Sequence, residues 1–159
     1  MNYTLAKDEL QDLYRELILD HARTPRNFRR LANATHTATG INALCGDKLH
    51  LYLVVDANDR VVETSFEGSG CAISMASASL LTETISDMSV ADANACFETV
   101  TRHLTRPPNG DGEATEFTFE KLRAFDGVRK YPSRVKCATL AWHALHAALN
   151  HSNSPATTE

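Results

Sequence analysis

Residues 47–68 restrict the fold most strongly, because they have the pattern of two strands joined by a tight turn. In the segment "DKLHLYLVV" every second residue is apolar, which is the period that places side chains on one face of a strand. These apolar residues are Leu49, Leu51, Leu53 and Val55. The following "DAND" is rich in turn-forming residues, and "RVVETSFEG" resumes an extended pattern. The sequence therefore predicts an antiparallel hairpin within a small sheet.

Helical patterns lie on both sides of this hairpin. The expected helices are 10–23, 71–88, 89–104, 119–125 and 137–150, and a weaker threonine-rich signal indicates another strand at 34–40. Pro25 limits the first helix, and a capping box begins the helix at Ser89. The segment around Pro132 is expected to be extended. Together these elements predict an α+β fold, in which an antiparallel sheet of about three strands carries helices mainly on one face.

The 159 residues fit a single domain. We expect an ordered core at about 9–150, an insertion at about 105–134 and loose ends at 1–8 and 151–159. The net charge of −4 argues against nucleic acid as a partner. The apolar runs are too short to cross a membrane, and the N-terminus lacks the basic and then apolar pattern of a signal peptide, so a cytoplasmic location is expected.

Four cysteines in a reducing compartment are not expected to form disulfides, which leaves buried fillers, metal ligands or reactive thiols. Cys71 follows Gly68 and Gly70 and opens a helix, and Cys137 is expected to open another. The unpaired N–H groups at a helix start favour a thiolate, which is the form that binds metal or attacks sulfur.

Cys45 differs from these two because it lies in a loop, with Asp47 two residues further on. Three cysteines and one aspartate suit a tetrahedral Zn²⁺ in ligand number and type. Such a set carries excess negative charge, which Arg134 and Lys136 could balance from just before Cys137.

Several other interpretations stay open at this point. Any single cysteine could be a packing residue, as we expect for Cys96, and the turn before Cys71 could cradle phosphate, although it lacks the Lys-Ser/Thr of a P-loop. We interpret His143 and His146 as side chains that lie at the surface or have their hydrogen bonds satisfied, and not as metal ligands. We interpret His21 as a cation at the end of a helix. The arginines of 23–30 form a solvated face or meet a partner's acidic patch.

Four segments together resemble the NifU/IscU family of iron–sulfur assembly proteins, and within it the SufU branch. They are "LYRELILDHARTPRNFR", "CGD", "EGSGCAISMASASLLTE" and "RVKCATLAW", and the resemblance covers about residues 10–150. Scaffold-type IscU proteins have a histidine where this chain has Lys136, and SufU-type proteins have an insertion between the second and third cysteines, as here. The family's metal ligands then fall on Cys45, Asp47, Cys71 and Cys137, and its basic residue falls on Arg134.

The resemblance implies a zinc-dependent sulfurtransferase. Its partner would be a PLP-dependent cysteine desulfurase of the SufS type, from which Cys45 would accept persulfide sulfur while a desulfurase histidine takes its place on the zinc. The sulfur would then pass to a downstream iron–sulfur scaffold. One alternative is a scaffold that itself holds a transient iron–sulfur cluster on the same cysteines. Another is a structural zinc module without chemistry.

Overall fold

The computed structural model describes residues 7–106, 119–151 and 154–158. Its helices and strands, in chain order, are α1 (Lys7–Arg23), β1 (His36–Asn42), β2 (Asp47–Val55), β3 (Val61–Ser69), α2 (Ala72–Thr84), α3 (Val90–Thr105), the 3₁₀ helix η2 (Glu120–Lys130), α4 (Pro132–Leu149) and β4 (Ala156–Thr157). Within these described ranges, no helix is both long enough and apolar enough to cross a membrane.

The sheet has the strand order β3-β2-β1-β4. β2 pairs antiparallel with both β1 and β3, which confirms the predicted antiparallel hairpin and the α+β class. β4 pairs in parallel with β1, with Gly40 opposite Ala156, so the sheet is mixed and has a short fourth strand. This strand lies in the tail that we expected to be loose, whereas residues 1–6 and 159 lie outside the described residues.

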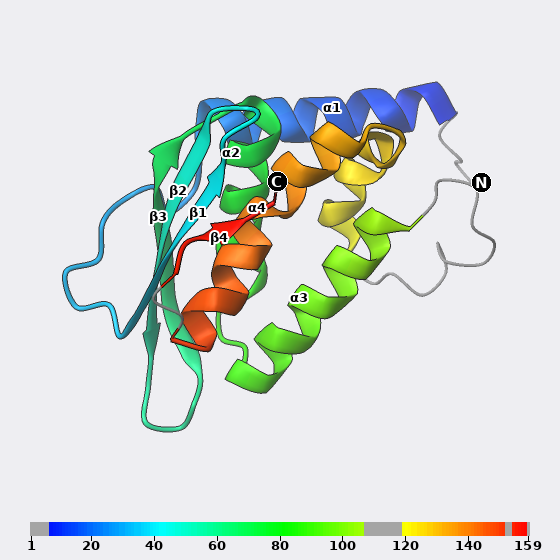
Figure 1. Ribbon diagram of the computed structural model, residues 1–159. Helices are drawn as coiled ribbons and strands as arrows, with labels where there is room; N and C mark the ends of the chain where they lie inside the picture. The colour runs from blue at the N-terminus through cyan, green and yellow to red at the C-terminus, as the bar shows by residue number, and fades with distance from the viewer. Residues whose placement is uncertain (1–6, 107–118, 152–153, 159) are drawn as a thin grey trace, which may run out of the picture.

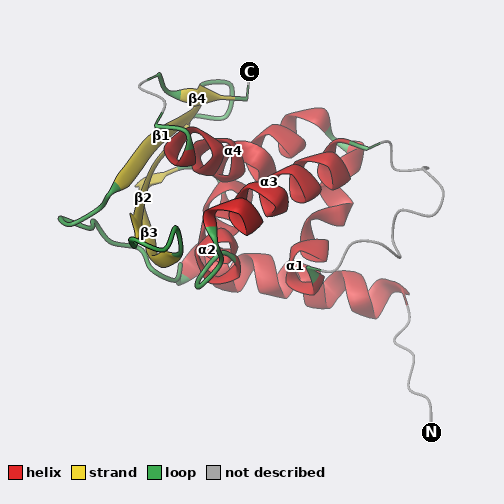
Figure 2. Cartoon of the chain, turned by 90° about the horizontal axis from the view of Figure 1, so that it is seen from below, coloured by secondary structure: helices red, strands yellow, loops and turns green. Residues whose placement is uncertain are grey.

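Helices α2, α3 and α4 lie on one side of the sheet, and α1 runs along the edge of this helical layer (Figure 1). The view from below shows the same two layers, with the strands on one side and the helices on the other (Figure 2). Leu49, Leu51 and Leu53 are buried between the layers, as the alternation in β2 predicts. The fully buried Trp142 on α4 belongs to the same core.

The serines of α2 connect this helix to its neighbours. The Ser77 hydroxyl donates to the carbonyl oxygen of Ala138 on α4 at 2.5 Å. The Ser79 Oγ lies 2.7 Å from Nδ1 of His21 on α1 and accepts the backbone N–H of Arg26 at 2.8 Å. These contacts join α2 to α4, to α1 and to the segment after α1.

The start of α4 differs from the sequence prediction. The segment around Pro132 is not extended, because Pro132 is the first residue of α4. A proline at this position is favourable, since its fixed φ suits the helix and the N–H that it lacks would have no partner there. Consequently Cys137 lies in the second turn of α4 and not at its start. Of the expected insertion, residues 107–118 lie outside the described residues.

Candidate metal centre

Three elements converge on one point at the end of the sheet. One ligand atom from each of Cys45, Asp47 and Cys137 lies within 4.8 Å of the others. The Cys71 Sγ lies 4.0 Å from Oδ2 of Asp47, so the fourth side chain borders the same cluster. The β1–β2 turn, the start of α2 and the second turn of α4 thus bring together all four side chains that the sequence singles out as ligands.

Cys45 and Asp47 are placed by the turn that joins β1 to β2. The strand register pairs Asn42 with Asp47, which leaves residues 43–46 as the turn. The N–H of Gly46 donates to the carbonyl oxygen of Ala43 at 3.2 Å and closes it. Asp47 is 1% exposed, whereas Cys45 is exposed to solvent. The turn therefore presents a thiol at the surface directly beside a buried carboxylate.

Cys71 is the N-cap residue of α2, as its position after Gly70 predicts. Its Sγ accepts the N–H of Ser74 at 3.5 Å, and its own N–H donates to Oδ1 of Asp47 at 2.8 Å. A Cβ atom on Gly70 would lie 2.6 Å from that same Oδ1. Gly68 has a φ of +141°, and a Cβ there would collide with the carbonyl oxygen of Lys48. Gly68 therefore lets β3 approach the backbone of β2 at Lys48, and Gly70 lets the start of α2 approach the Asp47 carboxylate.

Cys137 is only 1% exposed, and its pKa is raised. Burial is the main cause, and the nearby side chains of Cys45, Asp47 and Cys71 add to it. Because Cys137 is not at the helix start, the expected effect of the helix N-terminus on its thiolate does not apply. A raised pKa keeps the metal-free thiol protonated at neutral pH, so metal binding must release its proton.

Asn42 is a further member of the cluster that the sequence analysis did not identify. Its side chain is 0% exposed, and its Nδ2 lies 3.3 Å from Oδ2 of Asp47 and 3.5 Å from Sγ of Cys137. The sequence signal for Asn42 is a polar residue at an inward-facing strand position, shortly before "CGD".

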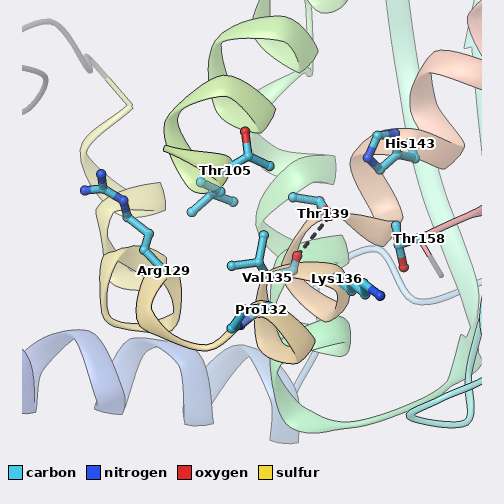
Figure 3. Close-up of a pocket in the computed structure, with 9 residues that line it drawn as sticks. Thr105, Arg129, Pro132, Val135, Lys136, Thr139, His143 and Thr158 are labelled. Atoms are coloured by element: carbon cyan, nitrogen blue, oxygen red, sulfur yellow. Dashed lines mark hydrogen bonds between the residues drawn. The ribbon is translucent and has the colours of Figure 1, made fainter. Parts of the chain in front are cut away.

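The two basic residues before Cys137, Arg134 and Lys136, lie in different surroundings. Arg134 is exposed and lies one helical turn before Cys137, and no ion pair joins it to Asp47 in the described part of the chain. Lys136 lies with Thr139 and His143 among the residues that line a cavity of about 400 Å³ (Figure 3). That cavity contains none of the four ligand side chains, so it is separate from the candidate metal centre.

Cys96 lies in the core at 2% exposure, and its burial raises its pKa to about 12, which fits the expected packing role. His21 is not a solvated cation at a helix end, because it is 2% exposed and burial lowers its pKa. The ring of His146 stacks on Phe97, away from the cluster.

Two of the arginines in 23–30 pair with carboxylates of this chain. Arg26 contacts Asp20 and Arg29 contacts Glu63, each at 2.6 Å. These two charges are therefore already matched within the molecule.

The donor set suits a thiophilic metal. Thiolates and a carboxylate in fourfold arrangement are the ligands of tetrahedral zinc, and thiolates also bind iron in clusters. The buried amide of Asn42 adds the hydrogen-bonding partner that ligands of such sites require.

Comparisons with known proteins show the family of the chain. The model of the NifU-like N-terminal domain family matches residues 13–154. The zinc-dependent sulfurtransferase SufU of Bacillus subtilis is 36% identical over 136 residues, which cover 86% of this chain and 88% of that protein. The iron–sulfur cluster assembly scaffold protein IscU of Thermotoga maritima is 38% identical over 144 residues, 90% of this chain and 96% of that protein.

Solved structures also match the fold. A crystal structure from Fervidobacterium islandicum, named as a scaffold protein of iron–sulfur cluster assembly for the SUF system, has a TM-score of 0.69 and 31% identity, and the match covers 84% of this chain and 94% of that one. The N-terminal part of a NifU-like protein from Brucella abortus has a TM-score of 0.74 at 24% identity, covering 90% of this chain and 96% of that one, and it supports the fold alone. Because the family model spans most of the sequence, the chain belongs to the NifU-like N-terminal domain family.

Proposed function

We propose that this chain, a member of an iron–sulfur cluster assembly family, is a zinc-dependent sulfurtransferase. In this proposal it accepts persulfide sulfur on Cys45 from a PLP-dependent cysteine desulfurase, of the SufS type, and Cys45, Asp47, Cys71 and Cys137 hold the zinc. The relative from Bacillus subtilis that carries this function in its name supports the proposal.

The contrast in exposure between Cys45 and its neighbours is the observation that carries the proposal. Cys45 is exposed on a turn, whereas Asp47 and Cys137 are each 1% exposed. A thiol must be reachable to attack a sulfur atom on another protein, and a ligand on a turn leaves a metal with less backbone rearrangement than a ligand on a helix. Among these side chains Cys45 therefore suits the role of acceptor.

The transfer step is a thiol exchange and needs no further oxidant or reductant. The Cys45 thiolate attacks the outer sulfur of the desulfurase persulfide, the S–S bond of that persulfide breaks, and the desulfurase thiolate leaves. Cys45 then carries the transferred sulfur as its own persulfide. Bound zinc would hold the cysteines as thiolates without redox chemistry of its own.

The experiment measures zinc content and desulfurase stimulation on the same preparations. The wild type is expected to hold one zinc per chain and to stimulate sulfide release from cysteine by the desulfurase. Cys45→Ala should abolish stimulation and retain the fold, because Cys45 is exposed. Peptide mass analysis should find the mass of one added sulfur on Cys45 in the wild type.

Cys96→Ala is the matched control, because Cys96 is a buried cysteine in the core outside the cluster. It should lower stability but leave zinc content and stimulation unchanged. Stimulation by Cys45→Ala at the wild-type level would contradict the proposed acceptor.

A scaffold for a nascent iron–sulfur cluster is the second candidate, and the relative named as a scaffold in Thermotoga maritima favours it. The same thiols could hold iron. Anaerobic reconstitution with iron and sulfide separates the two functions, since a stable cluster that passes intact to an apo-acceptor would favour the scaffold.

A further inference from the structure

Asn42 is the last residue of β1, and it pairs with Asp47, the first residue of β2, next to the turn that joins these two strands. Its Nδ2 contacts both Oδ2 of Asp47, at 3.3 Å, and Sγ of Cys137, at 3.5 Å. An amide nitrogen carries two hydrogens, so it can serve both acceptors at once. Asn42 therefore connects a ligand on β2 to a ligand on α4, two elements far apart in the sequence.

The burial of this amide needs an explanation. Asn42 is 0% exposed, and its Oδ1 has no hydrogen-bond partner within the described ranges of the chain. A buried polar atom without a partner lowers stability, so an apolar residue would suit this position better for folding alone. The side chain is best explained by the two acceptors that its nitrogen reaches.

Both acceptors would carry negative charge as ligands of a bound metal. Asp47 and a deprotonated Cys137 would bring two negative charges into a buried place, next to the thiolates of Cys45 and Cys71. An N–H donor stabilises such charges and fixes the orientation of the ligands. The N–H of Cys71 already serves Oδ1 of Asp47, at 2.8 Å, and the N–H of Ser74 serves the Cys71 sulfur, at 3.5 Å.

Cys45 is the exception in this arrangement. Across the described ranges, no backbone or amide N–H contacts its sulfur. We infer that Asn42 is a positioning residue, which holds Asp47 and Cys137 as permanent ligands so that Cys45 is the ligand that exchanges. This inference rests on the proposed function, because it presumes that the four side chains bind zinc.

The test compares Asn42→Asp and Asn42→Ala with the wild type. Asn42→Asp keeps the shape and replaces the donor by an acceptor, and Asn42→Ala removes both. Zinc affinity, measured by competition with a chromophoric chelator, is expected to fall on the order of 10- to 100-fold in Asn42→Ala, and further in Asn42→Asp. The absorption spectrum of the Co²⁺-loaded protein should also change, because the Cys137 thiolate loses its N–H donor.

Two further measurements distinguish positioning from a merely structural role. Tm is measured for each variant with and without zinc, since a structural role would lower both values and leave the zinc-dependent increase unchanged. Iodoacetamide labelling of the zinc-loaded proteins should modify Cys45 first in the wild type, and Cys137 at an increased rate in the variants. The Tm of the metal-free protein also shows whether each variant folds. If Asn42→Asp does not fold, the comparison with the wild type is made with Asn42→Ala alone.

Ser65→Ala is the matched control, because Ser65 is likewise 0% exposed on a strand and its Oγ lacks a partner among the described residues. It should leave zinc affinity and the Co²⁺ spectrum unchanged. If Asn42→Ala folds and binds zinc as tightly as the wild type, the role inferred for Asn42 is wrong, and the proposed function is unaffected. A wild type that binds no zinc would overturn the proposed function and this inference with it.

Discussion

Gly70 leaves the space that the Asp47 carboxylate needs beside the start of α2. A Cβ there would lie 2.6 Å from Oδ1 of Asp47 and 3.1 Å from Oγ of Ser74. The carboxylate would have to move, and its hydrogen bond with the N–H of Cys71 would be lost. One missing side chain thus determines whether the buried carboxylate of Asp47 can point into the candidate metal centre.

Gly70→Ala is therefore expected to lower the free energy of unfolding by about 1–3 kcal/mol, in the range of overpacking in a core. Zinc affinity should fall as well, because Asp47 is displaced. Urea denaturation and chelator competition measure the two effects. Gly127→Ala is the control, since a Cβ at Gly127 meets nothing within 4 Å, and equal behaviour of the two variants would contradict the assigned close approach.

Sequence reasoning placed Cys45, Asp47 and Cys71 in the candidate metal centre because their signals are local. A cysteine after "GSG" marks a helix start, and "CGD" before an alternating strand marks a turn. Asn42 was missed because its role depends on the strand register, which pairs it with Asp47 and brings it to Cys137. A single asparagine before a turn indicates turn chemistry equally well.

At the scale of elements, α1 and α2 are joined through a buried histidine. The Nδ1 of His21 lies 2.7 Å from Oγ of Ser79, and its Nε2 lies 3.7 Å from Oε1 of Glu83. Burial is the main cause that lowers the pKa of His21; Arg26 and Lys121 lower it further, while Glu83 and Asp20 act in the opposite direction. The contact between these helices therefore depends on a neutral imidazole.

The free energy of unfolding should consequently depend on pH through His21. A lowered pKa in the folded state means that the unfolded chain takes up a proton first, so the stabilisation is complete above about pH 6.5 and is lost as the pH falls below it. His21→Gln should show a shallower loss between pH 7 and pH 5.5 in urea denaturation. Equal slopes would contradict the role of His21, and comparing slopes removes the contributions of His36 and His143, whose pKa values are also lowered.

The boundaries of the elements were predictable where one rule applied and not where two competed. The bounds of β2, Asp47–Val55, match the alternating segment, and α3 begins after the capping residue Ser89. At Pro132 the tendency of proline to follow extended backbone competed with its preference for the first helical position. The second prevailed, because the consecutive residues from Cys137 to Trp142 are all buried, so α4 must be helical and enclosed from its second turn onward.

At the scale of the whole molecule, the candidate centre joins the sheet to the helical layer. Its side chains come from the β1–β2 turn, the start of α2 and α4, which belong to both layers in Figures 1 and 2. A metal bound there would cross-link elements that otherwise contact each other only by packing and hydrogen bonds. Metal binding and the stability of the entire fold should therefore be coupled.

Removal of zinc by a chelator is expected to lower Tm. A ligand present at about 1,000 times its Kd stabilises the folded state by about 4 kcal/mol, if the unfolded chain does not bind it. Differential scanning calorimetry with and without chelator measures the shift. Identical Tm values for the zinc-loaded and stripped proteins would contradict coupling, and Cys137→Ala, which lacks a buried ligand, should respond least to added zinc.

The order of these side chains along the chain has a consequence for biosynthesis. Cys45 and Asp47 leave the ribosome early, but Cys137 lies in α4, the last helix. A nascent chain can thus form the β1–β2 pair before it contains all four side chains of the candidate metal centre. If the four side chains bind zinc as proposed, the full ligand set exists only after Cys137 has been synthesised. Zinc captured by a polypeptide that ends before α4 would be held by an incomplete set, whose only thiols are those of Cys45 and Cys71.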